Sequence, residues 1–488
     1  FFYLIFIFFT KQINALEFEK VIYQLEHPSN GDFLALKKDN DNINRFIISG
    51  YNWKNRWLTS IAIDPMDNQI NETQAITLNS SLQYFDKARL YGSSEETIVF
   101  LGKSGLSQLN LKTYEIEPLL NTSSLYKIAY HKRLSHLDFS MDINGDNLSD
   151  FLIPDFQQLH VYMQKNNGEF KYQSLPVLST TEIRRSGVSY YPEKPYFYDV
   201  NSDNLIDVLF HVDGKVLAFL QNEALSFQSE PFMISTPIQL ANNYEAEIKN
   251  GEGRNFDELT IEEFNRFEDL NADGIVDLVT VKTDWEGITN QDGYFKAFLG
   301  AMDSGKLIFQ AQPIANIHVG GGQYGAEFKD INNDGLKDFY SPNIELGIGS
   351  IISALITGST GMDINFFPMS NQHKYSEKAD FSKEAKIRFS LKSGNISMPS
   401  VLVDDFTGDG ISDLLIQSST SKLKFYPGQK ARLFAKRSES TIKIDLPKNG
   451  QNVDTMDFNH DGKKDLIITF SGDDKKEWQQ QVHIYLTK

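Results

Sequence analysis

The sequence predicts an all-β protein built from repeats, and two observations support this prediction. A nine-residue pattern, Asp-x-Asn-x-Asp-x-apolar-x-Asp, recurs six times with small variations between residues 142 and 465. The chain is also 488 residues long, whereas a single hydrophobic core rarely extends beyond about 250–300 residues. A chain of this length forms several domains or one repeat architecture, and the recurring pattern favours repeats.

The chain begins with an apolar run, Phe1–Phe9, followed by polar residues and the small-residue stretch Ile13–Ala15. This run is too short to cross a bilayer, which takes about 20 residues. We interpret residues 1–15 as a truncated signal peptide, with a buried strand as the alternative. We therefore expect an exported protein, periplasmic or extracellular, whose mature chain starts near Leu16 and has no transmembrane span.

The composition argues against several classes of function. The chain has 65 acidic and 47 basic residues, a net charge of −18 and no cysteine. An acidic chain without a basic cluster is a poor match for a phosphate backbone, so we expect no nucleic-acid partner. Without cysteine the chain has no disulfide, thiol nucleophile or thiolate metal site. No Gly-x-Ser-x-Gly or His-Glu-x-x-His motif occurs, so we assign no catalytic residue and expect no zinc centre.

The nine-residue pattern has the chemistry of a calcium loop. Positions 1, 3, 5 and 9 supply side-chain oxygens and position 7 can supply its backbone carbonyl, whereas Ca²⁺ takes about six to eight oxygen ligands. Position 6 is Gly or Asn, the residues that tolerate a left-handed turn. Position 2 is always apolar, so its side chain can enter a core. One such stretch could be a solvated acidic turn, but six in register predict calcium, and Mg²⁺ is disfavoured because it prefers rigid, partly hydrated octahedral sites.

These five positions contain all the predicted metal ligands. They are Asp142, Asn144, Asp146, Leu148, Asp150, Asp199, Asn201, Asp203, Leu205, Asp207, Asp269, Asn271, Asp273, Ile275, Asp277, Asp330, Asn332, Asp334, Leu336, Asp338, Asp405, Thr407, Asp409, Ile411, Asp413, Asp457, Asn459, Asp461, Lys463 and Asp465. The loop with Thr407 at position 3 has the weakest ligand set.

Each loop is followed by an apolar strand, such as Phe151–Ile153 or Leu414–Ile416. With these strands the six loops resemble FG-GAP/VCBS repeats, the calcium-loop repeats of integrin-α-type β-propellers. The resemblance implies a single β-propeller over residues 16–488, with four-stranded blades and each loop joining the first and second strands of a blade. It also implies Ca²⁺ as the cofactor, at about six sites.

The spacing of the loops predicts the number of blades. First aspartates of successive loops lie between 52 residues apart (405 to 457) and 75 residues apart (330 to 405), enough for four short strands. The same spacing finds two decayed copies upstream, which makes eight blades, or seven because the first alignment is short. Their positions 1, 3, 5 and 9 are Lys37, Asp39, Asp41 and Arg45 in one copy and Arg89, Tyr91, Ser93 and Thr97 in the other. Lys37 and Arg45 could neutralise the two aspartates of the first copy.

The strands after the loops also repeat. We expect fourth strands at Phe170–Pro176, Phe227–Pro231 and Phe309–Pro313, whereas the last blade ends after its third strand near His483. Residues Phe18–Gln24 resemble Phe170–Gln173, so we predict that the N-terminal strand closes the ring by completing the last blade. Closure removes the free strand edges that promote aggregation.

Long connections on the face opposite the loops are the predicted binding region, since function often lies on long loops over a rigid scaffold. These connections are 189–196, 236–264 with a helix-like stretch at 256–264, 283–294, 320–324 and 371–398. Tyr190, Tyr191, Trp285 and Tyr324 could stack on sugars or anchor a protein, or they could merely cover the blade tops.

The sequence favours an exported, calcium-stabilised binding or adhesion module for a protein or carbohydrate ligand. The alternatives are a secreted carbohydrate-active enzyme such as a polysaccharide lyase, since calcium-bearing propellers of this kind also occur there, and a purely structural blade array. Function depends on sites rather than folds, so the structure of the loops and of the opposite face decides how far each hypothesis holds.

Overall fold

The computed structural model describes most of the chain. The described residues are 16–38, 43–52, 54–63, 70–126, 134–184, 187–241, 257–286, 291–319, 326–343, 356–389 and 395–488. The predicted signal peptide, residues 1–15, lies outside this part. Within it the secondary structure is almost entirely antiparallel β, and a single 3-10 turn, Gly450–Asn452, precedes β40.

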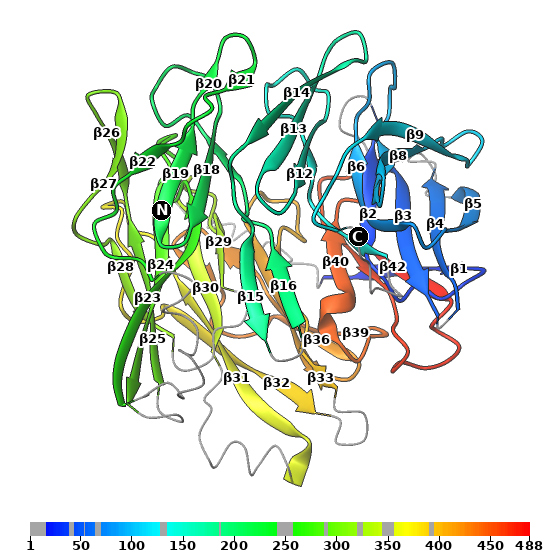
Figure 1. Cartoon of the computed structure of the whole chain (residues 1–488). Helices are drawn as coiled ribbons and strands as arrows, with labels where there is room; N and C mark the ends of the chain where they lie inside the picture. The colour runs from blue at the N-terminus through cyan, green and yellow to red at the C-terminus, as the bar shows by residue number, and fades with distance from the viewer. Residues whose placement is uncertain are drawn as a thin grey trace, which may run out of the picture.

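Eight sheets of at least four strands form the blades of a β-propeller, in the order of the chain (Figure 1). Blade 1 consists of β2 (Phe33–Lys37), β3 (Ile43–Tyr51), β4 (Arg56–Ile63) and β5 (Ile70–Thr77). Blade 2 consists of β6 (Leu82–Ala88), β7 (Thr97–Gly102), β8 (Gly105–Leu109) and β9 (Ile116–Asn121). Blade 3 consists of β11 (Ser140–Met141), β12 (Asp150–Pro154), β13 (Leu159–Gln164) and β14 (Phe170–Leu175). Blade 4 consists of β17 (Tyr196–Tyr198), β18 (Asp207–Val212), β19 (Lys215–Phe219) and β22 (Phe232–Ile234).

The other four blades follow the same plan. Blade 5 consists of β23 (Asp257–Glu268), β24 (Asp277–Glu286), β25 (Gln291–Phe298) and β28 (Ala315–His318). Blade 6 consists of β29 (Glu327–Lys329), β30 (Asp338–Asn343), β31 (Ser359–Phe367) and β32 (Phe381–Phe389). Blade 7 consists of β34 (Val401–Asp404), β35 (Asp413–Ser419), β36 (Lys422–Tyr426) and β39 (Ser440–Lys443). Blade 8 consists of β40 (Val453–Met456), β41 (Asp465–Ile468), β42 (Gln481–Thr487) and the N-terminal strand β1 (Phe18–Gln24).

Extra strands decorate this frame. Blade 2 gains β10 (Ser135–His136), which runs parallel to β6, and blade 6 gains β33 (Ile396–Ser397). Four hairpins lie outside the blades. They are β15–β16 (Thr180–Arg184, Gly187–Tyr191), β20–β21 (Gln221–Asn222, Ser226–Phe227), β26–β27 (Gly300–Asp303, Lys306–Phe309) and β37–β38 (Gly428–Gln429, Arg432–Phe434).

The two decayed copies occupy the expected places. In blade 3 the residue before the loop, Met141, pairs with Asp150 at position 9. Leu36 pairs with Arg45 in blade 1 and Ala88 pairs with Thr97 in blade 2 in the same way. The eight-blade prediction is therefore confirmed and the seven-blade alternative is wrong. Asp39 and Asp41 lie outside the described residues.

The hydrophobic core consists of eight clusters, one between each pair of neighbouring blades. The apolar residue at position 2 of each loop lies in one of these clusters. These residues are Ile143, Val200, Leu270, Ile331, Phe406 and Phe458, and each is at most 3% exposed. The prediction that position 2 points into a core is confirmed, and every loop is thereby fixed to a packed interface.

Ring closure by the N-terminus is also confirmed. All of β1, from Phe18 to Gln24, pairs antiparallel with β42, from Thr487 back to Gln481 (Figure 1). Tyr23 of β1 is 8% exposed and packs with Phe46 of blade 1 and Phe458 of blade 8. The strand therefore completes blade 8 and also joins the last interface of the ring.

Three expectations about the connections are wrong. The fourth strands of blades 4 and 5 are β22 and β28, because Phe227 and Phe309 instead fold into the preceding hairpins β20–β21 and β26–β27. The following prolines, Pro231 and Pro313, have no N–H to donate to a ladder, so the fourth strands start after them.

The described part of the helix-like stretch 256–264 belongs to strand β23, which begins at Asp257 and whose long ladder with β24 overrides the local pattern. Finally, the first part of 371–398 lies on the loop face and not opposite to it. Tyr375 shows this, because its hydroxyl donates to the carbonyl of Lys337, at position 8 of the blade 6 loop.

The closure strand should be a major source of stability. We expect Tyr23→Ala to lower the free energy of unfolding by about 3 kcal/mol, because it leaves a cavity between blades 8 and 1. Ile22→Ala, which changes a neighbouring side chain that is 48% exposed, is the matched control and should cost less than about 1 kcal/mol. Chemical denaturation measures both values, and equal effects would contradict the closing role of β1.

Candidate metal centres

All six nine-residue loops join the first and second strands of their blades, as the resemblance implies. Each loop is shaped by two left-handed residues, at positions 4 and 6. In blade 3 these are Gly145 (φ 75°) and Asn147 (φ 64°), and in blade 5 they are Ala272 (φ 56°) and Gly274 (φ 81°). Position 6 was expected from the sequence, whereas position 4 was not, because Ser, Ala, Asn and His are also found there.

The carboxylate at position 1 is held inside its own loop. Its Oδ2 accepts the backbone N–H of position 6 at 2.8–3.0 Å in all six loops, for example from Asn147 to Asp142 and from Gly335 to Asp330. The Oδ1 atom accepts the N–H of position 5 in five loops. The exception is the loop of blade 5, where the Oδ1 atom of Asp269 is buried and has no hydrogen-bond partner.

The side chains at positions 3 and 5 face each other across the same loop. In the five loops with Asn at position 3, its amide nitrogen lies 2.9–3.2 Å from Oδ2 of the Asp at position 5. Thr407 replaces Asn in blade 7 and its hydroxyl lies 3.5 Å from Asp405, the residue at position 1. The Oδ1 atom of the same Asn accepts the backbone N–H of position 5, so the side-chain oxygens of positions 1, 3 and 5 lie within one turn of chain.

Position 9 has a structural role that the spacing alone does not reveal. Its carboxylate is at most 1% exposed in every loop. Asp150 accepts the N–H of Ile143 at 3.0 Å on Oδ2 and that of Gln164 at 2.7 Å on Oδ1. Asp338 does the same with Ile331 and Met369. One oxygen thus holds position 2 of the loop, and the other holds the end of the third strand.

The four other blades with a loop repeat both contacts. The donors are Val200 and Gln221 to Asp207, Leu270 and Gly300 to Asp277, Phe406 and Gly428 to Asp413, and Phe458 and Thr487 to Asp465. The position-9 carboxylate therefore joins the first, second and third strands of each of these blades.

The loops concentrate negative charge. Burial, followed by the nearby carboxylates at positions 5 and 1, raises the pKa of Asp150, Asp277 and Asp338 to about 7, although the backbone N–H donors lower it. The same causes raise the pKa of Asp207 and Asp413 to about 6, and that of Asp465 likewise. A divalent cation among these carboxylates removes the repulsion.

The donor set fits calcium. It consists of carboxylate, amide and carbonyl oxygens, which are the ligands of a hard cation. Within the described residues no Lys or Arg forms an ion pair with the carboxylates at positions 1 and 5, and the unpartnered Oδ1 of Asp269 has no protein donor to satisfy it. The loops are therefore negatively charged cradles without a cation from the chain itself.

The four aromatic residues proposed for the opposite face are only partly brought together. Tyr190 and Tyr191 are 41% and 48% exposed on β16, and Tyr190 packs edge-on against Phe156 with ring centroids 4.7 Å apart. Trp285 is half-buried near the end of β24 in blade 5, and Tyr324 lies outside the described residues. The β15–β16 hairpin, a separate two-stranded sheet in the middle of the view in Figure 1, is therefore the defined part of this face.

The sequence did not identify the apolar residues that extend this patch. Leu178, just before β15, is 57% exposed and Val188 on β16 is 49% exposed. Val188 and Tyr190 share one face of the strand by alternation, and Tyr191 lies on the other face of the same strand. Scattered single apolar residues on a surface are ordinary, so only their grouping on one hairpin, known from the fold, marks them.

One Ser–His–Asp group lies where the chain passes from blade 2 to blade 3, but its geometry is not that of a nucleophilic triad. Ser123 Oγ and Asp155 Oδ2 approach the same nitrogen of His160, Nε2, at 3.0 and 3.3 Å. The other ring nitrogen, Nδ1, lies 3.0 Å from the hydroxyl of Tyr172. A triad places the serine and the carboxylate on opposite nitrogens, so this group is a polar core network.

Comparisons with known proteins give matches to solved structures and to one repeat family. Three of the matching solved structures have low sequence identity to this chain. A lectin from Agrocybe aegerita, described as recognising non-reducing terminal N-acetylglucosamine, is 12% identical with a TM-score of 0.42, covering 84% of this chain and 94% of its own. A putative 6-phosphogluconolactonase from Bacteroides fragilis is 11% identical with a TM-score of 0.33, covering 82% and 95%. The V. cholerae biofilm matrix protein Bap1 is 11% identical with a TM-score of 0.26, covering 97% and 91%.

These TM-scores are too low to inform the function, and no curated protein matches the sequence. No helix in the described residues is long and apolar enough to cross a membrane. The profile of the FG-GAP-like repeat family matches residues 142–210 and 405–468, which contain loops of blades 3, 4, 7 and 8. The chain therefore contains FG-GAP-like repeats, and it folds as an eight-bladed β-propeller.

Proposed function

We propose that the chain is an exported, calcium-stabilised interaction module that binds a protein or glycan partner on the face opposite its loops. The observation that carries the calcium part is the repeated loop geometry. Six loops gather the side chains of positions 1, 3 and 5, and no described Lys or Arg neutralises the carboxylates. Bound Ca²⁺ would supply that charge and hold the loops rigid between adjacent blades.

The residues that would hold calcium are the oxygen donors of each loop. Positions 1, 3 and 5 supply side chains, and position 7 supplies its carbonyl. Position 9 already accepts two backbone N–H groups, but each carboxylate oxygen has a second lone pair with which it can bind a cation. The loops of blades 1 and 2, with Lys37 and Arg89 at position 1, would hold none.

The binding part of the proposal rests on the β15–β16 hairpin. This hairpin belongs to no blade sheet, so the ring does not need its apolar side chains for closure. Phe156, Leu178, Val188, Tyr190 and Tyr191 are each at least 37% exposed. Grouped aromatic and aliphatic side chains are typical of contact sites. The aliphatic members favour a protein partner, whereas the tyrosines also allow sugar stacking.

The alternative function is that of an enzyme, which would release products from its glycan where a binding module would not. The Ser123–His160–Asp155 network lacks a triad arrangement, and the loop carboxylates would be engaged by the ion. Polysaccharide lyase activity would produce unsaturated products from an acidic glycan, whereas a binding module would retain the glycan without releasing products.

Calcium removal should destabilise the protein strongly. Ions that bind only the folded state add about 1.4 to 2.7 kcal/mol per site at ten to one hundred times the dissociation constant. Extracellular calcium modules bind at about 10⁻⁴–10⁻³ M, so we expect a chelator to lower Tm markedly relative to about 10 mM Ca²⁺. Calorimetry measures Tm in both conditions and with Mg²⁺ as the control. An unchanged Tm would contradict calcium in the loops.

Two neighbouring substitutions should separate ion binding from folding. Asp334→Asn, at position 5, should lower the calcium-dependent gain in stability and cost less than about 1 kcal/mol in chelator, because Asp334 is exposed and water can replace its contacts with Leu336 and Asn332. Asp338→Asn, at position 9, should cost about 1–3 kcal/mol even in chelator, because the new amide cannot accept both N–H groups. Denaturation curves with and without Ca²⁺ measure this difference. Equal behaviour of the two variants would contradict the separate roles.

The hairpin should carry the partner contact. We expect the double substitution Tyr190→Ala and Tyr191→Ala to weaken binding at least about tenfold, because interface aromatics dominate affinity. The matched control is Tyr91→Ala, which removes a tyrosine that is 53% exposed in the blade 2 loop. A glycan array and pull-down from the native envelope identify the ligand, and titration then compares the variants. Full binding by the double variant would place the contact elsewhere.

A further inference from the structure

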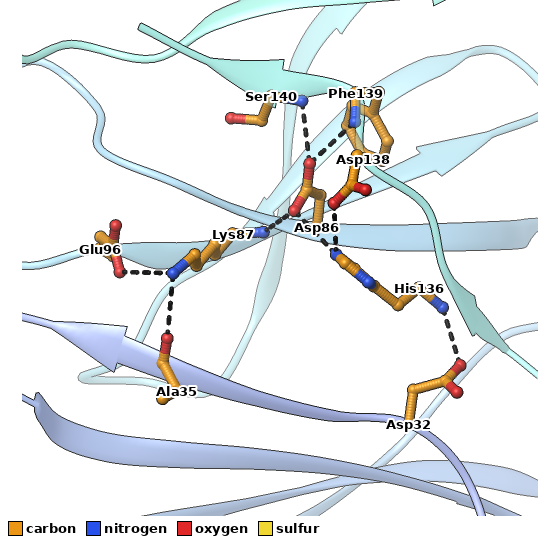
Figure 2. Close-up of polar contacts among 9 residues, drawn as sticks. All are labelled: Asp32, Ala35, Asp86, Lys87, Glu96, His136, Asp138, Phe139 and Ser140. Atoms are coloured by element: carbon orange, nitrogen blue, oxygen red, sulfur yellow. Dashed lines mark hydrogen bonds and ion pairs between the residues drawn. The ribbon is translucent and has the colours of Figure 1, made fainter. Parts of the chain in front are cut away.

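A histidine and two aspartates converge where blades 1, 2 and 3 meet, outside the six loops. Asp86 lies on β6, His136 lies on β10 and Asp138 follows it (Figure 2). We propose that this group, the Asp86–His136–Asp138 cluster, binds a divalent transition-metal ion of the Zn²⁺ class. The proposal concerns a separate site and does not depend on the calcium assignment.

The distances in the cluster match a tetrahedral centre. His136 Nε2 lies 3.2 Å from Oδ1 of Asp86 and 3.4 Å from Oδ1 of Asp138. One ligand atom from each of the three residues lies within 4.8 Å of the other two. Ligands bound about 2.0–2.1 Å from Zn²⁺ at tetrahedral corners are about 3.3 Å apart. An ion can therefore occupy the space between the three atoms with little movement of the side chains.

Two of the three ligands, Asp86 and His136, are held in place before any ion binds. The Asp86 side chain is 5% exposed, and its Oδ2 accepts the backbone N–H groups of Phe139 and Ser140, both at 2.9 Å. The backbone N–H of His136 donates to Asp32 of blade 1 at 2.9 Å, which fixes the strand that carries the histidine. Figure 2 shows the His136 ring pointing from β10 toward both carboxylates. Outer contacts of this kind orient metal ligands.

The residue types distinguish this cluster from the calcium loops. A calcium site uses oxygen donors, whereas an imidazole nitrogen together with carboxylates suits Zn²⁺ and its neighbours. Asp86 lies on the strand itself, before the decayed loop that begins with Arg89. The three residues come from two separate segments, so no local motif in the sequence signals them.

A cavity of about 650 Å³ opens onto the cluster. All three residues line it, together with Lys37, Lys87 and Arg89. Lys87 Nζ lies 3.7 Å from Glu96 and 3.4 Å from the carbonyl of Ala35, so it bridges blades 2 and 1 (Figure 2). Three protein ligands leave the fourth position of a tetrahedral ion open toward this cavity, where water or an oxygen donor from a ligand completes the site.

The competing explanation is that the histidine simply carries a proton and forms ion pairs with both aspartates. A proton and a metal ion satisfy the same two carboxylates and occupy the same lone pair of Nε2, so a bound metal displaces the proton from Nε2. His318 offers a matched control. Its Nε2 lies 2.9 Å from Asp292 and its side chain is 53% exposed, but no second carboxylate joins this pair among the described ion pairs.

The test uses the full chain in saturating Ca²⁺, so that the loops do not compete for the added ion. Co²⁺ serves as a spectroscopic probe for Zn²⁺, and calorimetric titration with Zn²⁺ gives the stoichiometry. We expect one equivalent of Zn²⁺ per chain, Co²⁺ absorption bands that report a nitrogen ligand, and a higher Tm with Zn²⁺.

His136→Gln should abolish the site, and Asp138→Asn should weaken it at least about tenfold. The Asp138 side chain is 86% exposed, so this variant tests the site without risk to folding. His318→Gln should bind as the unaltered protein does. Three results would overturn the proposal. The unaltered protein could bind no Zn²⁺ in the presence of Ca²⁺, or the His136 and Asp138 variants could bind Zn²⁺ as tightly as the unaltered protein does. The third is that the His318 variant loses as much Zn²⁺ affinity as the His136 variant.

Discussion

The hydrogen bonds of the buried aspartate at position 9 connect the acidic loops to the propeller frame. One carboxylate accepts an N–H group from its own loop and another from the end of the third strand, and this arrangement recurs in blades 3 to 8. The backbone of position 2 is thereby fixed, and its apolar side chain enters the core between two blades. In these six blades one buried side chain therefore links the loop, the third strand and the packing between neighbouring blades.

Contacts between loops extend this constraint around the ring. The N–H of position 8 donates to a carbonyl at position 1 or 2 of the preceding blade in several places, such as Lys337 to Leu270 and Ser412 to Ile331. The decayed loops take part, since Ser149 donates to Arg89 and Glu96 donates to Lys37. Blades 1 and 2 thus keep this backbone contact, although Lys37 and Arg89 replace aspartate at position 1.

The fold was predictable where short-range chemistry repeats. Asp at positions 1, 5 and 9 and an apolar residue at position 2 recur locally, so the spacing revealed eight blades. The N-terminal closure followed from the likeness of Phe18–Gln24 to Phe170–Gln173. The hairpins of blades 4 and 5 were not predictable, because Phe227 and Phe309 fit either a hairpin or a fourth strand and only the full sheet decides between them. The cluster of Asp86, His136 and Asp138 was missed for a related reason, since strand pairing brings its members together.

The central claim is that the six acidic loops are ion sites and that the two decayed loops are not. Equilibrium dialysis followed by metal analysis tests this directly, because it counts the bound Ca²⁺ per chain without reference to stability or activity. The account predicts about six calcium ions per chain at millimolar free Ca²⁺. A chain that binds no calcium under these conditions would contradict it.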